Sequence, residues 1–206
     1  MLRVIDNFLD DPYAVRNIGL KLFNAEYRDN ERDSAWPGLR SRVPDSLSKK
    51  YISKIESIVD DKLLIKNIYF QWVDETWVSG CWHIDPEHYT IMTFLSLDAP
   101  SNTGIEIADN TDNMANGINC YNYILNFNLN KIPFYKSSRN YYQRYQFKKK
   151  MDKFNSSPCF KNACTVSNKF NRTVIFNRFQ LHRAQKFFGK GKKARFTLIA
   201  FCDVTT

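Results

Sequence analysis

Two of the three histidines in this 206-residue chain stand in a pattern that can hold a metal ion. His83 and Asp85 form a His-x-Asp pair, and His182 follows far downstream. Because alternate residues of an extended segment point to the same side, His83 and Asp85 can both reach one ion. Two imidazoles and one carboxylate on one face of a metal leave its other positions open, which is the ligand set of non-haem Fe(II) oxygenases. The pattern therefore predicts a metal centre with His83, Asp85 and His182 as ligands.

A cation is expected near this centre. Arg195 and Thr197 follow His182, and alternation along the final strand-like run puts them on one face among apolar residues. A charged group in such surroundings is costly unless it binds an anion, and the planar fork of arginine suits a carboxylate. Two interpretations stay open: Arg195 binds a carboxylate ligand, or it lies exposed at the strand end beside Lys192 and Lys193.

Two helices are predicted ahead of these residues. Asp11-Pro12 combines an N-cap carboxylate with a proline at the first helical position, and apolar residues at helical spacing extend the helix over about 12–25. Asp45 is predicted to cap a second helix with one apolar stripe. We expect both helices to pack on the outside of a sheet.

From about residue 62 onward the hydrophobic period changes to two, which is typical of strands. Helices first and short strands after them indicate a β-sandwich or jelly roll flanked by N-terminal helices. In this arrangement His182 lies in the turn after a strand. The predicted strands are rich in β-branched and aromatic residues: Leu64–Val73, Tyr89–Leu97, Ile105–Ala108, Thr173–Asn177 and Phe196–Val204.

The length fits a single domain, 1–206, with an insertion between core strands at about 109–171. The insertion is rich in Asn, Tyr, Phe and Lys and has little periodicity before 141–154, which could form a basic helix. A long insertion in a compact domain is usually a lid or a binding element.

The charge is unevenly distributed. Residues 131–206 contain 18 Lys and Arg against 2 Asp and Glu, whereas residues 1–130 contain 12 against 19. Solvated outer faces are one interpretation of the basic part, and an acidic partner such as nucleic acid is the other.

No signal peptide and no membrane-spanning run is found in the sequence. The five cysteines are odd in number and form no CxxC pair, which favours reduced thiols and a cytoplasmic protein.

Four segments follow one another in an order that resembles a known family: Asp6–Val15; Trp82-His-Ile-Asp85 with the run to Leu97; Asn102–Ile105; and Phe176–His182 with Phe188-Gly189 and Arg195–Phe201. The chain resembles the Fe(II)/2-oxoglutarate-dependent dioxygenases, in particular small prolyl-4-hydroxylase-like proteins common in phage genomes. The likeness covers roughly the first 108 residues and the last 36, and the insertion between them matches nothing in the family.

The resemblance implies a mainly β fold with flanking α, the double-stranded β-helix (a jelly-roll, cupin-like architecture) with N-terminal helices. It implies that His83, Asp85 and His182 hold Fe(II), and that Arg195 pairs with the far carboxylate of 2-oxoglutarate, with Thr197 as a hydroxyl partner. The co-substrate would be decarboxylated to succinate while a substrate C–H bond is hydroxylated, with ascorbate as a supporting reductant. If a phage encodes the protein, the host cytoplasm is its compartment.

The chain departs from the family at one position. Many relatives place a tyrosine on the strand after His-x-Asp, where this chain has Thr93-Phe94. The hydroxyl that assists the co-substrate is then expected from Tyr69 or a threonine. His88 does not fit the family spacing and is interpreted as a rim or surface residue. Three tryptophans near the site are interpreted as core residues rather than substrate platforms: Trp72, Trp77 and Trp82.

Three functions remain to be weighed. The first is a hydroxylase acting on a protein or peptide side chain such as proline, which follows from the prolyl-hydroxylase-like motif order. The second is an oxygenase acting on nucleic acid, because the stretch 135–154 interleaves aromatic residues with lysines. The third is a non-catalytic β-sandwich binding module in which the triad is coincidental. The sequence predicts nothing about oligomeric state.

Overall fold

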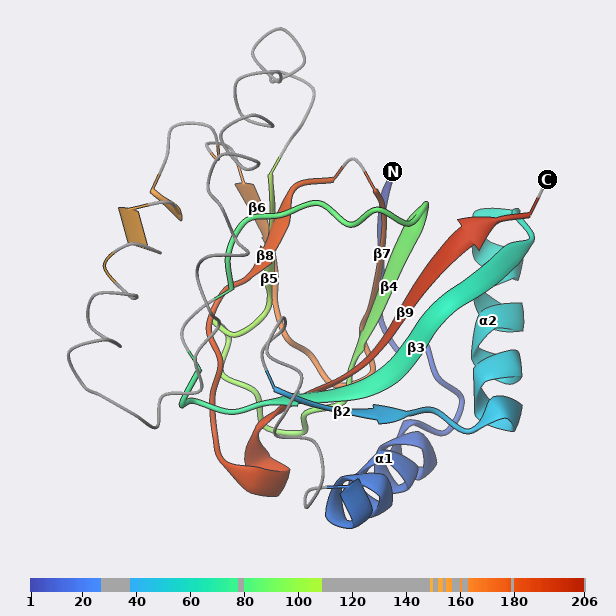
Figure 1. Cartoon of the computed structure of the whole chain (residues 1–206), viewed down its shortest axis with the longest axis horizontal. Helices are drawn as coiled ribbons and strands as arrows, with labels where there is room; N and C mark the ends of the chain where they lie inside the picture. Colours follow the sequence, from blue (N-terminus) through green and yellow to red (C-terminus); the bar gives the residue numbers. More distant parts are fainter. Residues whose placement is uncertain are drawn as a thin grey trace, which may run out of the picture.

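The computed structural model describes residues 1–26, 38–77, 80–108, 149, 152, 153, 155, 156, 160, 163–178 and 180–205 (Figure 1). In this part of the chain two antiparallel sheets and two long helices form the fold, which confirms the mainly β jelly-roll prediction. Figure 1 shows the helices and the smaller sheet on opposite sides of the larger sheet.

The larger sheet has six strands in the order β1-β7-β4-β9-β3-β2. The last strand of the chain lies near its middle and pairs antiparallel with both β3 and β4. A strand with neighbours on both sides and layers on both faces is buried, and the first six residues of β9, from Arg195 to Ala200, are all buried. The strands are β1 (Leu2–Ile5), β2 (Leu39–Arg42), β3 (Leu63–Val73), β4 (Tyr89–Phe94), β7 (Thr173–Asn177) and β9 (Arg195–Val204).

The smaller sheet contains β5 (Ile105–Ala108) between β6 (Ala163–Val166) and β8 (His182–Ala184). His182 therefore begins a strand and does not lie in a turn, because β8 pairs with β5. The strand β6 falls inside the range 109–171 that we predicted as an insertion, so residues 163–166 belong to the sheet framework. Both strands are too short to show a period of their own, and their pairing with β5 is long-range.

The helices α1 (Pro12–Glu26) and α2 (Asp45–Val59) cover one face of the larger sheet. Asp11 caps α1 as predicted, since its Oδ1 accepts a hydrogen bond from the Ala14 N–H at 2.9 Å. Asp45 is not a cap: Pro44 occupies the N-cap position and Asp45 is the first helical residue. The prediction failed there because a proline fixes an extended backbone angle one residue earlier.

Alternating side chains of the larger sheet contribute to two hydrophobic cores, one on each face. The helices pack on even-numbered residues of β3 and β9, such as Phe70 and Leu198, in the larger core. The second core lies between the two sheets and contains even-numbered residues of β4 and β7, such as Phe94 and Phe176. The remaining inner face between the sheets carries the candidate site.

The strand predicted to reach Leu97 ends at Phe94, and Leu97 is exposed. Within the described residues, no helix is long and apolar enough to cross a membrane. Cys81, Cys164 and Cys202 are free thiols, while Cys120 and Cys159 lie outside the described residues.

Candidate metal centre and its cavity

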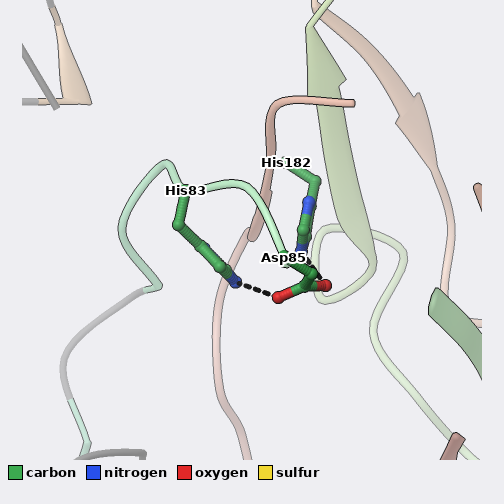
Figure 2. Close-up of side chains that lie close together, drawn as sticks. All are labelled: His83, Asp85 and His182. Atoms are coloured by element: carbon green, nitrogen blue, oxygen red, sulfur yellow. Dashed lines mark ion pairs between the residues drawn. The ribbon is translucent and has the colours of Figure 1, made fainter. Parts of the chain in front are cut away.

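His83, Asp85 and His182 converge as the sequence predicted (Figure 2). Their candidate ligand atoms all lie within 4.8 Å of one another. The His182 Nε2 lies 3.2 Å from Asp85 Oδ2, and the His83 Nε2 lies 3.7 Å from Asp85 Oδ1. Two imidazole nitrogens and a carboxylate oxygen this close together can serve as a three-ligand set for one metal ion.

The backbone holds the two histidines opposite one another. His83 and His182 form an isolated antiparallel bridge, in which each N–H donates to the other residue's carbonyl at 3.1 and 3.0 Å. Because β8 belongs to the smaller sheet while the loop of His83 leads into β4, the bridge fixes one ligand from each layer. Gly80 permits this approach, since a Cβ there would lie 2.8 Å from the Ala184 nitrogen.

The tautomer of both imidazoles is fixed by backbone carbonyls. The Nδ1 of His83 lies 2.8 Å from the Cys81 carbonyl oxygen, and the Nδ1 of His182 lies 2.9 Å from that of Gln180. A carbonyl only accepts, so each Nδ1 carries the proton and each Nε2 keeps its lone pair. This second-sphere arrangement is the usual one for histidines that bind a metal.

The charge states also suit a metal. Burial and the neighbouring imidazole of His182 lower the pKa of His83 to about 4, so its ring is neutral at neutral pH. Burial acts to raise the pKa of Asp85, but His182, His83 and the Thr90 hydroxyl together hold it below its usual range. A neutral imidazole and an ionised carboxylate are the protonation states that metal binding requires.

Thr90 was not identified from the sequence. Its hydroxyl donates to Asp85 Oδ2 at 2.5 Å from the buried face of β4. The signal was present, because Thr90 is the polar residue on a strand face whose other members are Met92 and Phe94. Thr93 faces the other way and bonds to Tyr51 and Thr173, so it supplies no hydroxyl to the site.

Arg195 lies in the same cavity and is only 2% exposed, which excludes the interpretation of an exposed strand end. Its guanidinium contacts the Met92 sulfur at 3.3 Å and lies over the rings of Phe94 and Phe187. Among the described residues no carboxylate pairs with it, and its Nε has no hydrogen-bond partner. Burial lowers the pKa of Arg195 to about 10, so it remains charged at neutral pH. A buried, charged guanidinium of this kind is suited to an anion supplied by a ligand.

Thr197 and Tyr69 occupy different places. Thr197 is fully buried on the same face of β9 as Arg195, its hydroxyl has no partner among the described residues, and it does not line the cavity. Tyr69 on β3 does line the cavity, beneath the guanidinium of Arg40 at 4.3 Å from the ring centre. Burial raises the pKa of Tyr69 to about 12, so it acts as a neutral hydroxyl.

The cavity measures about 370 Å³ and opens between the two sheets. Its walls combine apolar side chains with polar and charged ones that converge on the triad and Arg195. Gln71 and Arg40, which are cross-strand neighbours, also line it and were not predicted from the sequence. Neither stands out in the sequence because alternation alone does not reveal which face of a strand borders a cavity.

The other residues that the sequence analysis considered lie outside the triad. His88 bonds to Asp203 at 2.9 Å and is partly exposed, as expected for a surface residue. Trp72 and Trp82 are buried and stack on Phe196 and Phe160, as core residues do. The stretch 135–154 lies almost wholly outside the described residues.

No family model matches the chain, and no curated protein matches it in sequence. Solved structures do match in three dimensions. A prolyl-4-hydroxylase from Pseudomonas putida aligns over 100% of this chain and 93% of its own, with TM-score 0.56 and 8% identity. A prolyl hydroxylase from Trichoplax adhaerens, in complex with a peptide fragment of hypoxia inducible factor, aligns over 98% and 83%, with TM-score 0.53 and 10% identity.

The non-heme alpha-ketoglutarate-dependent epimerase SnoN of nogalamycin biosynthesis aligns over 100% of this chain and 77% of its own, with TM-score 0.58 and 10% identity. At identities this low the structural likeness establishes the fold, and the chemistry has to be argued from the residues of the site. The chain therefore has the double-stranded β-helix fold of the prolyl hydroxylases and related oxygenases.

Proposed function

We propose that the chain is an Fe(II)- and 2-oxoglutarate-dependent dioxygenase that hydroxylates a C–H bond. The observation that carries the proposal is the pairing of two features in one cavity: a two-histidine, one-carboxylate cluster and the buried guanidinium of Arg195, which no described carboxylate neutralises. A binding module with a coincidental triad would need neither the fixed Nδ1 protons nor a buried cation without a carboxylate partner.

Each residue has a role in this proposal. His83, Asp85 and His182 hold Fe(II), and Arg195 binds the far carboxylate of 2-oxoglutarate through its planar fork. Bound iron and 2-oxoglutarate supply the oxidising chemistry, with ascorbate as a supporting reductant. The chain's own part is to orient the co-substrate and exclude water. Tyr69 offers a neutral hydroxyl at the cavity wall, and Thr197 has a buried hydroxyl without a described partner on the same face of β9 as Arg195.

The direct test measures iron and co-substrate binding together. Iron content by elemental analysis should approach one ion per chain, and 2-oxoglutarate or N-oxalylglycine should raise the melting temperature only when iron is present. His83→Ala and Asp85→Ala should abolish both responses, while His88→Ala, a histidine outside the triad, should keep them. Unchanged metal content in the triad variants would instead favour the non-catalytic module.

We propose a protein or peptide side chain, with proline as the first candidate, as the substrate. The support is the fold shared with prolyl hydroxylases, one of which was solved with a peptide bound. Candidate peptides incubated with iron and 2-oxoglutarate should gain the mass of one oxygen atom. The peptide assignment fails if no peptide is modified and none stimulates turnover of 2-oxoglutarate.

Nucleic acid is the second candidate substrate, and the observation that favours it is the excess of 18 basic over 2 acidic residues in 131–206. Binding through phosphates would weaken steeply as salt rises, because counterions are released on association. A gel-shift titration over increasing salt tests this. An absent or salt-insensitive shift would exclude nucleic acid.

A further inference from the structure

A second cavity, of about 530 Å³, lies where β2 leaves the larger sheet and leads into α2. Figure 1 shows β2 running toward the first turn of α2 while β3 continues along the sheet. Three residues line both this cavity and the cavity of the triad, which we call the iron cavity: Arg40, Asn67 and Tyr69. The two cavities therefore lie on either side of the stacked Arg40–Tyr69 pair.

One wall of the second cavity is an open strand edge. The pairing of β2 with β3 stops at Arg42 opposite Tyr69, whereas β3 continues to pair with β9 back to Leu63. No described strand covers the other edge of β3 between Ile65 and Ile68, and these residues line the cavity. Such an edge can accept an extended polypeptide as an added strand.

Two buried hydroxyls line the same cavity without a hydrogen-bond partner. Ser41 on β2 is 2% exposed and Ser48 in α2 is 6% exposed, and neither Oγ is bonded to any described residue. An unsatisfied buried hydroxyl costs free energy, so native structures rarely leave two together without a ligand or water. They point to an acceptor-bearing group that enters this cavity.

The charge of the lining favours an anion as that group. Four basic side chains line the cavity against one carboxylate, Asp45, which is already paired with Arg42 at 3.2 Å. Lys49 is exposed on α2 and has no carboxylate partner among the described residues. A β-bulge between Ile65 and Asn67 takes Lys66 out of the regular ladder, and Lys66 pairs with Asp203 at 3.3 Å, which leaves Lys49 to meet a ligand's charge. The basic residues are Arg40, Arg42, Lys49 and Lys66.

We propose that the second cavity binds an acidic side chain of an extended polypeptide substrate whose target residue enters the iron cavity. This inference rests on the proposed oxygenase function and adds a specificity determinant to it. The open β3 edge favours a polypeptide over a nucleic acid, because only a polypeptide backbone can continue the ladder of a sheet. The carboxylate would accept hydrogen bonds from Ser41 and Ser48 and lie near Lys49.

Fluorescence anisotropy with a short labelled peptide of alternating Glu and Thr tests the site in the full chain at near-physiological salt. The matching Gln–Thr peptide should bind at least about tenfold more weakly, because its amides lack the charge. Lys49→Glu should weaken binding of the acidic peptide by about tenfold. Lys21→Glu makes the same charge change on exposed α1, away from both cavities, and should have little effect.

A serine variant separates binding from folding. Ser41→Ala combined with Ser48→Ala should weaken acidic-peptide binding by roughly fivefold and leave the melting temperature unchanged, since neither hydroxyl has a described partner. The inference is overturned if both peptides bind equally, if Lys21→Glu weakens binding as much as Lys49→Glu, or if oligothymidylate displaces the acidic peptide at lower concentration. If the acidic peptide binds but the chain responds to neither iron nor 2-oxoglutarate, the acidic-peptide site is upheld and only the proposed oxygenase function is refuted.

Discussion

At the scale of single residues, the candidate site depends on groups that hold the ligands as much as on the ligands. Thr90 donates to Asp85 at 2.5 Å and helps to keep that carboxyl ionised. Thr90→Val removes this hydrogen bond at nearly constant shape. We expect the affinity for Fe(II) to fall by about 10- to 100-fold, as for other residues that support a metal ligand.

The control for this prediction lies on the same strand. Thr93→Val changes the opposite face of β4, where the hydroxyl bonds to Tyr51 and Thr173, so it should lower stability and leave the iron affinity unchanged. Competition with a fluorescent metal chelator measures both variants. Equal iron affinity in Thr90→Val and the unmodified chain would contradict the proposed support.

Replacing Arg195 should have opposite effects on the stability of the free chain and on its stabilisation by 2-oxoglutarate. Without co-substrate, the chain buries a charge that no described carboxylate neutralises, so Arg195→Met should raise the free energy of unfolding by about 1–2 kcal/mol. The same variant should lose the thermal stabilisation by 2-oxoglutarate. Arg195→Lys keeps the charge without the planar fork and should retain part of that response. If Arg195→Met still responded fully to 2-oxoglutarate, Arg195 would not be the carboxylate-binding residue.

At the scale of elements, a buried hydroxyl chain joins α2 to the larger sheet. The Tyr51 hydroxyl lies 2.8 Å from that of Thr93, which in turn lies 2.5 Å from that of Thr173. Tyr51→Phe removes the first link while keeping the aromatic packing on Phe8. We expect a loss of about 1 kcal/mol in unfolding free energy, measured by urea denaturation, with iron binding unchanged. A loss of iron binding would show that α2 reaches the site.

The first strand is held by an ion cluster that responds to pH. Asp6 bonds to Arg172 at 2.6 Å and to Lys169 at 2.8 Å, and both cations hold the pKa of Asp6 below its usual value of 3.8. A lowered pKa stabilises the folded state above pH 3.8 and ceases to do so as pH falls below that value.

Asp6→Asn should therefore destabilise the protein by about 1 kcal/mol near pH 7, a value discounted for the partial exposure of the cluster. The difference from the unmodified chain should shrink as pH falls through about 4 and vanish in stronger acid. Urea midpoints across this pH range measure it, with the exposed Asp98→Asn as the matched control. A difference that stayed constant with pH would rule out the ion cluster as its cause.

Elements with an apolar run or apolar stripe of their own were predictable, and strands without one were not. Helix α1 and strands β5 and β7 follow from apolar spacing to within one residue. The strands β2, β6 and β8 have three or four residues each and owe their strand geometry to partners far away in the chain. Their positions decide the site, because β8 carries His182 and β2 carries Arg40.

At the scale of the whole molecule, the same limit separates the triad from its surroundings. The types and spacing of His83, Asp85 and His182 predicted the candidate metal cluster without the order of the strands in the sheets. The cavity walls required the order of six strands, and therefore pairings such as Arg40 with Gln71 and Gln71 with Thr197 that no local pattern contains. The burial of Arg195 has the same origin, because its position on β9 is enclosed by both sheets.

A metal ion bound by these three residues would connect the two sheets. Asp85 is fixed to β4 of the larger sheet through Thr90, while His182 belongs to the smaller sheet. Binding to the folded state alone stabilises it by about 2.7 kcal/mol when the free metal is at a hundredfold excess over its Kd. Because the ligands span both sheets, amide hydrogen exchange should slow in the smaller sheet, β5 and β8 included, as well as around His83.

Hydrogen exchange followed by mass spectrometry, with and without Fe(II) under anaerobic conditions, measures this protection. Chelation should reverse it, and His182→Ala should abolish it in both layers, because the remaining pair belongs to one loop. Protection confined to residues 81–90 would show that the ion binds one loop without joining the sheets. Protection of β5 and β8 would instead show that metal binding stabilises the smaller sheet. Its strand β8 cannot be predicted from a local sequence pattern, yet it supplies His182 to the metal centre.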